Sequence, residues 1–248
     1  MQGDAMDPAS GGAAARQAEQ DGWKRAAADA ALAEVASGMT LGLGTGSTAD
    51  LFVRALAERT RQGLSVTGVA TSERTASLAR ALGIPLVDFD AVDHLDVSFD
   101  GADEVTLPGL SLVKGRGGAL LHEKLVALAS RRRIILADDT KIVAALGVGT
   151  IIPTEVTMFG WRHTAARLAA LGCQVTLRPA AGAQPPAPFI SDSGNYTLDL
   201  VFATPQNPTQ LAIAIKATPG VIDHGLFIGV TDRVYIGGPG GARAADRQ

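Results

Sequence analysis

Cysteine is almost absent from this chain of 248 residues, and aromatic residues are scarce. Cys173 is the only cysteine, which excludes an intrachain disulfide and suits a reducing cytoplasm. Its place at the start of a short apolar strand predicts a buried small side chain rather than a nucleophile. Phenylalanine, tryptophan and tyrosine make up only 4% of the residues. We therefore expect a core of alanine, valine, leucine and isoleucine.

Strong net charge, long apolar runs and a secretory signal are lacking as well. The formal net charge of -3 argues against a general nucleic-acid binder but leaves room for a small anionic ligand. No apolar stretch approaches the roughly 20 residues of a membrane span. Residues 1–20 are rich in alanine, glycine and glutamine, without a basic region followed by an apolar one. We expect this segment to be a mobile tail and the protein to be cytoplasmic, with no membrane or nucleic-acid partner.

Strands and helices alternate over the first 147 residues. Strands are predicted at 39–43, 65–70, 84–87, 95–99, 111–114 and 134–137, and helices at 23–35, 49–60, 72–82 and 119–130. The arginine run at 131–133 is predicted to end the last of these helices, where positive charge suits the helix dipole. This alternation is typical of an α/β, Rossmann-like fold with a doubly wound parallel sheet.

The pattern changes after Leu146. Strands at 154–158, 174–177, 195–202 and 226–230, with helices at 160–171 and 207–217, follow the βαββαβ order of a ferredoxin-like domain. We expect this smaller α+β domain, 148–227, to be inserted into a Rossmann-like domain made of 21–147 and 228–240. The stretch 234–236 would return to the main sheet. Residues 241–248 are expected to be a second mobile tail.

A glycine-rich loop follows the first strand, with the sequence Gly44-Thr45-Gly46-Ser47-Thr48, and a helix comes next. Strand, glycine loop and helix form a cradle for phosphate, because backbone N–H groups and the positive helix end face the ligand. The P-loop lysine is missing. The dinucleotide pattern is met only loosely, and the next strand ends in Thr71-Ser72 rather than in the ribose-binding acid. A phosphate monoester fits better, and a tight turn that binds nothing is the alternative.

Charged residues crowd the stretch from Asp100 to Glu123. Asp100, Asp103 and Glu104 lie within five residues, and Lys114 and Glu123 follow. Carboxylates could bind Mg²⁺, but Lys114 would compete for their oxygens, so a metal is not required. The four histidines show no ligand spacing, and no histidine is partnered for nucleophilic catalysis. The residues alone thus argue against a transition-metal site and leave Mg²⁺ possible but not required.

Acid–base chemistry on a sugar accounts better for these residues. Moving a proton between neighbouring carbons needs a carboxylate base and donors that hold the developing oxyanion. Glu123, on a helix, suits the base, and Lys114 suits the oxyanion. Asp100 and Asp103 could handle hydroxyl protons, including those of ring opening, and their mutual repulsion would raise some of their pKa values. Glu104 is expected to stabilise the turn.

These motifs stand in order with further short blocks over about residues 22–237. The blocks are 44–48 (GTGST), 100–104 (DGADE), 114–119 (KGRGGA) with Glu123 and Lys124, 137–141 (ADDTK), 192–196 (DSGNY), 219–221 (PGV) and 224–227 (HGLF). Together they resemble ribose-5-phosphate isomerase, type A. The resemblance implies interconversion of ribose 5-phosphate and ribulose 5-phosphate through an enediolate, without metal or organic cofactor, in the non-oxidative pentose phosphate pathway. It gives Glu123 the proton transfer between C1 and C2, and gives Asp100, Asp103 and Lys114 ring opening and the oxyanion.

The resemblance also implies a binding set, a partner and a fold. The fold is Rossmann-like with an inserted α+β domain, and a homodimer is expected. The substrate-binding residues would be Thr45, Gly46, Ser47, Thr48, Gly101, Ala102, Gly115, Arg116, Gly117, Lys141 and Lys24. Arg116 stands where many members have glycine, and 178–188 is not family-like and is expected to be a surface loop. A related sugar-phosphate enzyme, such as an amino-sugar-phosphate deaminase, and a sugar-phosphate sensor are the alternatives.

Overall fold

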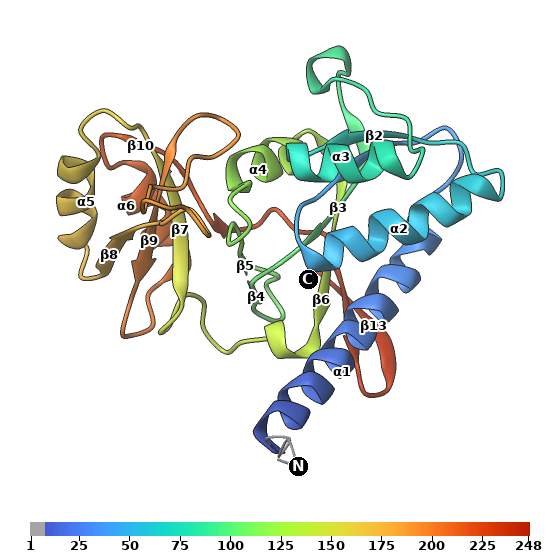
Figure 1. Cartoon of the computed structure of the whole chain (residues 1–248), viewed down its shortest axis with the longest axis horizontal. Helices are drawn as coiled ribbons and strands as arrows, with labels where there is room; N and C mark the ends of the chain where they lie inside the picture. Colours follow the sequence, from blue (N-terminus) through green and yellow to red (C-terminus); the bar gives the residue numbers. More distant parts are fainter. Residues whose placement is uncertain (1–7) are drawn as a thin grey trace, which may run out of the picture.

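The chain is described here by a computed structural model that covers residues 8–248, with side chains from residue 15 onward. Figure 1 shows a larger unit on the right and a smaller one on the left. The larger unit is built on a six-stranded sheet of β13 (Gly241–Asp246), β12 (Arg233–Gly238), β6 (Ser130–Asp138), β3 (Leu95–Gly101), β1 (Thr40–Leu43) and β2 (Thr67–Ala70), in that order. Strands β2, β1, β3, β6 and β12 are parallel, and β13 is antiparallel to β12.

Helices pack on both faces of this sheet, as its apolar strands require. They are α1 (Pro8–Ala31), α2 (Ser47–Arg61), α3 (Glu73–Ala81) and α4 (Leu120–Leu128), and a 3-10 turn, η1 (Leu32–Glu34), follows α1. One face packs on α1 and α2, where the rings of Phe52 and Phe99 stack with centroids 4.2 Å apart. Val126 of α4 packs against the other face. Ser72 caps α3 by accepting a hydrogen bond from Thr75 N, as its sequence position predicts.

The smaller unit has the predicted ferredoxin-like order. Its antiparallel sheet runs β10 (Val221–His224), β7 (Ile151–Val156), β9 (Tyr196–Val201), β8 (Gln174–Leu177), and it carries α5 (Trp161–Ala169) and α6 (Pro208–Lys216). Asn207 caps α6 through Gln210 N at 3.0 Å, with Pro208 in the first turn. The fold class predicted from the sequence is thus confirmed. The strands of this second sheet all lie within the predicted range 148–227.

A small third sheet lies between the two units. It consists of β4 (Glu104–Val105), β5 (Leu112–Val113) and β11 (Leu226–Phe227). Lys114, directly after β5, donates its backbone N–H to Gly225 O at 2.8 Å. Two further 3-10 turns are η2 (Phe89–Ala91), which lies between α3 and β3, and η3 (Asp139–Lys141), which follows β6. No helix within residues 8–248 is both long enough and apolar enough to cross a bilayer.

Both predicted tails are wrong where the structure describes them. Residues 8–20 of the first tail form the start of α1, and residues 1–7 lie outside the described part of the chain. Alanine and glutamine favour a helix, so the composition read as a tail continues the helix instead. Residues 241–246 form β13, which pairs with β12 along its whole length. Backbone pairing with β12 holds this strand, together with the ion pairs Arg233–Asp246 and Arg243–Asp139, since its own side chains are mostly exposed.

Three local predictions also need correction. The arginine run 131–133 does not end α4 but lies in β6, where Arg132 pairs with Glu34 and Arg133 with Asp232. The strand predicted at 84–87 is reduced to a single bridge between Gly68 and Leu86. The last strand of the smaller sheet is 221–224, and the predicted 226–230 contributes β11 to the third sheet. In each case the partner that decides the structure is distant in sequence.

Candidate active site

The site lies at the carboxyl edge of the main sheet, where β1, β3 and β6 end. Ligands in open parallel sheets bind at this edge. Strand β1 delivers the loop from Gly44, and β3 delivers Asp100. The two segments approach so closely that a Cβ added at Gly44 would lie 2.2 Å from Asp100 Cγ. Glycine at this position therefore allows Asp100 Oδ1 to accept a hydrogen bond from Thr45 N at 3.2 Å.

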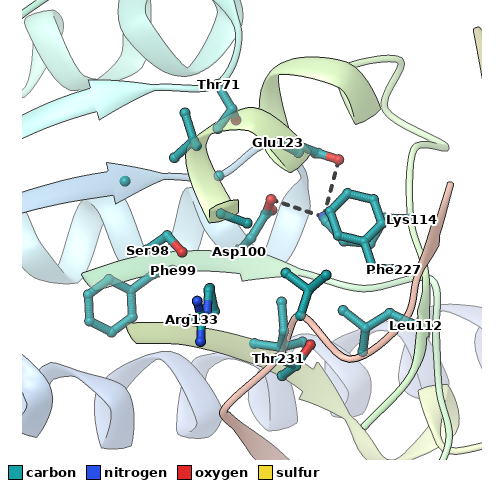
Figure 2. A pocket seen from close by; sticks show the side chains of 16 residues that line it. Thr71, Ser98, Phe99, Asp100, Leu112, Lys114, Glu123, Arg133, Phe227 and Thr231 are labelled. Atoms are coloured by element: carbon teal, nitrogen blue, oxygen red, sulfur yellow. Dashed lines mark ion pairs between the residues drawn. The ribbon is translucent and has the colours of Figure 1, made fainter. Parts of the chain in front are cut away.

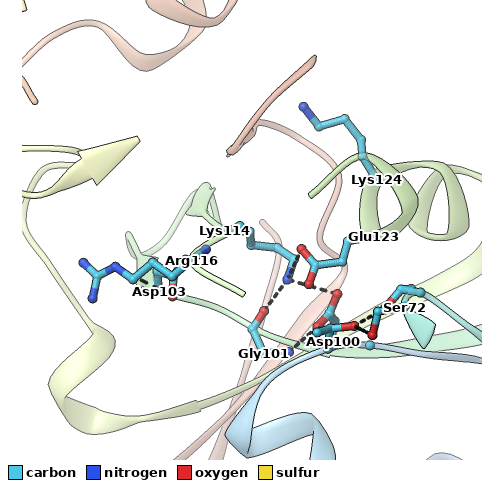
Figure 3. Close-up of polar contacts among 12 residues, drawn as sticks. Ser72, Asp100, Gly101, Asp103, Lys114, Arg116, Glu123 and Lys124 are labelled. Atoms are coloured by element: carbon cyan, nitrogen blue, oxygen red, sulfur yellow. Dashed lines mark hydrogen bonds and ion pairs between the residues drawn. The ribbon is translucent and has the colours of Figure 1, made fainter. Parts of the chain in front are cut away.

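Lys114 is the centre of a buried charged cluster. Its Nζ lies 3.0 Å from Asp100 Oδ2 and 3.2 Å from Glu123 Oε2, and it donates to Gly101 O at 2.7 Å. The exposed fraction is 7% for Asp100 and 3% for both Lys114 and Glu123. Figure 3 shows the two carboxylates on either side of the ammonium group. Two buried acids thus share one buried cation.

This arrangement shifts the proton affinities of the cluster. Burial, with the neighbouring Asp100 charge, raises the pKa of Glu123 to about 8, although Lys114 opposes the shift. Burial also raises the pKa of Asp100, against Lys114 and the backbone donors. Burial would lower the pKa of Lys114, but the charges of Asp100 and Glu123 outweigh it and raise that pKa. The cluster therefore holds a cation and is poised to bind or release a proton on a carboxyl group near neutral pH.

The cluster borders an inner cavity with apolar walls, and these surroundings account for the desolvation of its carboxyl groups. Figure 2 shows Asp100, Lys114 and Glu123 facing it together with the apolar side chains of Phe99, Leu112 and Phe227. Within the described residues, Glu123 Oε2 has no hydrogen-bond partner, because its contact with Lys114 Nζ meets the distance of an ion pair but not the geometry of a hydrogen bond. Apart from the Lys114 ammonium group, no described group of the protein pairs with Oε2, so this oxygen can still accept a proton.

A pocket opens in front of the cluster. Its walls bring together every residue of the predicted site except Asp100: Lys24, Thr45, Gly46, Ser47, Thr48, Gly101, Ala102, Asp103, Lys114, Gly115, Arg116, Gly117, Glu123 and Lys141. Asp100 lies behind Lys114 and lines the inner cavity instead. Asp103 accepts a hydrogen bond from Arg116 N at 3.1 Å, with Arg116 Nε 3.9 Å from its other oxygen.

One end of the pocket favours an anion. Helix α2 begins at Ser47, and the N–H groups of its first turn have no acceptor four residues earlier in the helix. Gly46 precedes it with φ of 126°, a conformation that glycine adopts readily. Lys24 and Lys141 add positive charge, although Lys24 Nζ also lies 3.0 Å from Asp21. These features suit a phosphate group at this end of the pocket.

Several neighbouring residues serve the structure. Glu104 accepts a hydrogen bond from Gly147 N at 2.7 Å, so it ties β4 to a distant loop rather than stabilising its own turn as expected. His122 contacts Ser193 Oγ at 2.9 Å and does not line the pocket. Lys124 donates to Asp223 Oδ1 at 2.5 Å and to His224 O at 2.6 Å, and so ties α4 to β10. Within residues 15–248, no group of three or more histidine, cysteine, aspartate or glutamate side chains is arranged to hold a metal.

The sequence interpretation missed two supports of the pocket. Thr75 donates to Gly44 O at 2.9 Å and shares a buried hydroxyl network with Thr45, Thr71 and Ser72. The position of 71–75 directly after a parallel strand is a signal that could have identified this network. Arg178 donates to Gly115 O and Arg116 O from the smaller unit. Its position in a segment read as a surface loop gave no such signal.

Fold and site together define a Rossmann-like α/β protein with an acid–base pocket for a small anionic ligand. The model of one family, ribose 5-phosphate isomerase A (phosphoriboisomerase A), matches residues 67–241. The chain belongs to this family.

Proteins that carry this family name are similar to the chain over nearly its whole length. A ribose-5-phosphate isomerase A of Thermomicrobium roseum is 52% identical over 90% of this chain and 93% of its own length. The structure of a ribose 5-phosphate isomerase from Plasmodium falciparum has a TM-score of 0.86 at 36% identity, covering 92% of this chain and 99% of that one. A D-ribose-5-phosphate isomerase in complex with phospho-erythronic acid has a TM-score of 0.85 at 35% identity, covering 91% of this chain and 98% of that one.

Proposed function

We propose that this protein interconverts ribose 5-phosphate and ribulose 5-phosphate, as an aldose–ketose isomerase. The observation that carries the proposal is the pairing of Glu123 with Lys114 on the wall of a pocket whose other end favours phosphate. Family membership supports the same activity. Phospho-erythronic acid, bound by one similar isomerase, is a phosphorylated sugar acid and matches a pocket with an anion end and a cation beside the base.

The reaction moves one proton between two carbons. In the open-chain sugar, Glu123 takes the proton from C2, and the electrons of that C–H bond form a C1–C2 double bond while charge moves to the C1 oxygen. Lys114 stabilises this oxygen of the enediolate. Return of the proton from Glu123 to C1, with transfer of the C2 hydroxyl proton to the C1 oxygen, gives the ketose. No atom is gained or lost, and no electron acceptor is needed.

The two aspartates have different positions, and we assign them different tasks. Asp103 lies on the pocket wall, where it can exchange hydroxyl protons with the sugar, including those of ring opening. Asp100 contacts Lys114 at 3.0 Å and does not line the pocket. It acts on the substrate through Lys114, by holding the ammonium group in place and keeping it charged.

The phosphate end follows from the cradle at α2. Ser47 and Thr48 begin the helix, and Thr45 precedes it in the loop that β1 delivers to the pocket. Backbone N–H groups at a helix start bind phosphate through hydrogen bonds and the helix dipole. Lys24 and Lys141 supply the balancing charge.

None of the described histidines lines the pocket, so the deaminase alternative lacks the histidine–acid pair it would need.

Replacing the base tests the proposal. Turnover of ribose 5-phosphate is measured with EDTA present for the parent and for Glu123→Gln, which keeps the size of the side chain but cannot take a proton. We expect metal-independent turnover in the parent and a fall in kcat by about 10² or more in the variant, the scale of acid–base catalysis. His122→Gln, one residue away on α4 and outside the pocket, is the control and should keep parental kcat. Full activity of Glu123→Gln would refute the base, and an inactive parent would refute the function.

Assembly and location rest on the family resemblance. We propose a homodimer in the cytoplasm, acting in the pentose phosphate pathway. Native mass spectrometry of the full chain measures the first directly, and a monomer at micromolar concentration would contradict it.

A further inference from the structure

Arg178 reaches from the smaller unit to the glycine loop that forms one wall of the pocket. It follows β8, and its backbone N–H donates to Thr197 O at 2.9 Å. Its residue surface is only 8% exposed. The side chain therefore leaves the smaller sheet buried, and it ends against residues 115–116 of the larger unit.

The guanidinium group of Arg178 pairs with a carboxylate of the smaller unit and donates to two carbonyl groups of the larger unit. Nε lies 3.2 Å and 3.1 Å from the two carboxylate oxygens of Asp199 on β9. Nη1 donates to Gly115 O at 2.9 Å and to Arg116 O at 3.2 Å. A planar guanidinium fork makes this double attachment, and a lysine ammonium does not reproduce it.

Phe189 holds the same loop from a neighbouring position. Its N–H donates to Arg178 O at 2.8 Å, and its ring centroid lies 5.9 Å from the guanidinium carbon of Arg178. A Cβ added at Gly118 would come within 2.3 Å of the ring, so the loop backbone packs directly on Phe189. The segment after β8 thus contacts both ends of the turn that lies between Gly115 and Gly118.

These contacts fix which way the peptide groups of the loop point. In a trans peptide the C=O and the following N–H point in opposite directions. Since Arg178 holds the Arg116 carbonyl, the Gly117 N–H points away from the smaller unit. Gly117 lines the pocket, and a Cβ added there would lie 3.5 Å from Thr45 Cγ2. Within the described residues, the Gly117 N–H makes no hydrogen bond.

We propose that Arg178, braced by Asp199, is a positioning residue that aims the Gly117 N–H into the pocket as a donor for the bound sugar phosphate. The proposal rests on the isomerase function above. We expect this donor to contact a part of the sugar phosphate that does not change during proton transfer. Its loss weakens the ground state and the transition state equally, so KM rises while kcat is kept. Lys114 keeps its position, because its N–H binds Gly225 O and its Nζ binds Asp100.

The test compares Arg178→Gln and Arg178→Lys with the parent by steady-state turnover of ribose 5-phosphate and by calorimetric binding of phospho-erythronic acid. Both variants should raise KM and the dissociation constant about tenfold, the usual loss for one hydrogen bond to a charged group, with kcat within about threefold of the parent. Asp199→Asn, which keeps Arg178 but weakens its brace, should shift KM in the same direction by less. Thermal melts followed by circular dichroism show that each variant is folded.

Arg233→Gln is the matched control, because Arg233 pairs with Asp246 through two contacts of 2.6 Å and 2.9 Å between β12 and β13. It should leave KM unchanged. If Arg178→Gln does not fold, Asp199→Asn and Arg178→Lys decide. Parental KM and parental affinity for phospho-erythronic acid in a folded Arg178 variant would overturn the inference, as would a loss confined to kcat. An inactive parent would instead overturn the proposed function, while the binding comparison would still decide the role of Arg178.

Discussion

Replacing Lys114 by methionine is the sharpest test of the buried cluster. Methionine keeps an unbranched side chain but removes the cation that lies 3.0 Å from Asp100 and 3.2 Å from Glu123. Two buried carboxyl groups then face each other without a positive charge. We expect both to hold their protons in the folded state, because burial already raises both pKa values in the parent, the Asp100 charge raises that of Glu123 further, and the opposing charge of Lys114 is gone.

The magnitude follows from the number of protons bound. A carboxyl group whose pKa is raised by folding stabilises the folded state below its unfolded pKa, and this stability is lost as pH rises through the folded pKa. The parent holds this extra proton on Glu123 below about pH 8. Lys114 lowers the pKa of Asp100 in the parent, so its removal should add up to one more proton on Asp100. Each extra proton makes the free energy of unfolding fall by about 1.4 kcal/mol more per pH unit. Between pH 6 and pH 8 the variant should therefore lose up to about 2.7 kcal/mol relative to the parent.

Urea unfolding of both proteins at pH 6 and pH 8 measures this difference, and turnover at pH 8 measures the loss of the oxyanion partner. We expect kcat to fall by about 10² to 10³. Lys141→Met is the matched control, since Lys141 lines the same pocket and makes no ion pair within the described residues. It should show the parental pH slope. A Lys114→Met variant whose destabilisation is the same at both pH values would refute the coupling of the three charges.

Two further predictions concern the proposed base, Glu123, and Gly44, which lies against Asp100. The kcat/KM of the parent should rise with pH between 7 and 9.5, with an apparent pKa near 8, because Glu123 acts only when ionised and its pKa is raised to about 8. The substrate phosphate, with a second pKa of about 6, is already about 90% doubly ionised at pH 7. A flat pH profile would contradict the assignment of the base. Gly44→Ala should destabilise the fold by about 1–3 kcal/mol and reduce turnover, since its Cβ would lie 2.2 Å from Asp100 Cγ. The control, Gly22→Ala, adds a methyl group to α1 with nothing within 4 Å and should be neutral or stabilising in the same urea titration.

Local sequence patterns predicted the parts of the fold that local physics decides. Ser72 and Asn207 cap helices through their own side chains, so their neighbours alone identify them. The strand, glycine loop and helix around Gly46 are equally local. The charged groups between Asp100 and Glu123 could be predicted to lie together, because parallel strands end at one edge of the sheet.

Elements held by distant partners were not predictable in this way. The arginines at 131–133 lie in β6 because β3 and β12 pair on either side of that strand. Glu34 and Asp232 form ion pairs with Arg132 and Arg133. Strand β13 has no apolar alternation and depends on β12 for its backbone hydrogen bonds. The separation of Asp100 from the pocket wall depends on where Lys114 lies, which no spacing along the chain reveals.

The end of β10 has a consequence for how far the two units are independent. Gly225 O holds the backbone of Lys114, and Asp223 with His224 O holds Lys124, the neighbour of Glu123. The larger unit carries every charged group of the cluster, yet the smaller unit fixes the segments on which two of those groups stand. The protein is therefore not modular: a chain trimmed to its main sheet would keep the charged side chains of the cluster but lose contacts that align them. We expect exchange of the smaller unit between family members to alter the alignment of Lys114 and Glu123 without changing either residue.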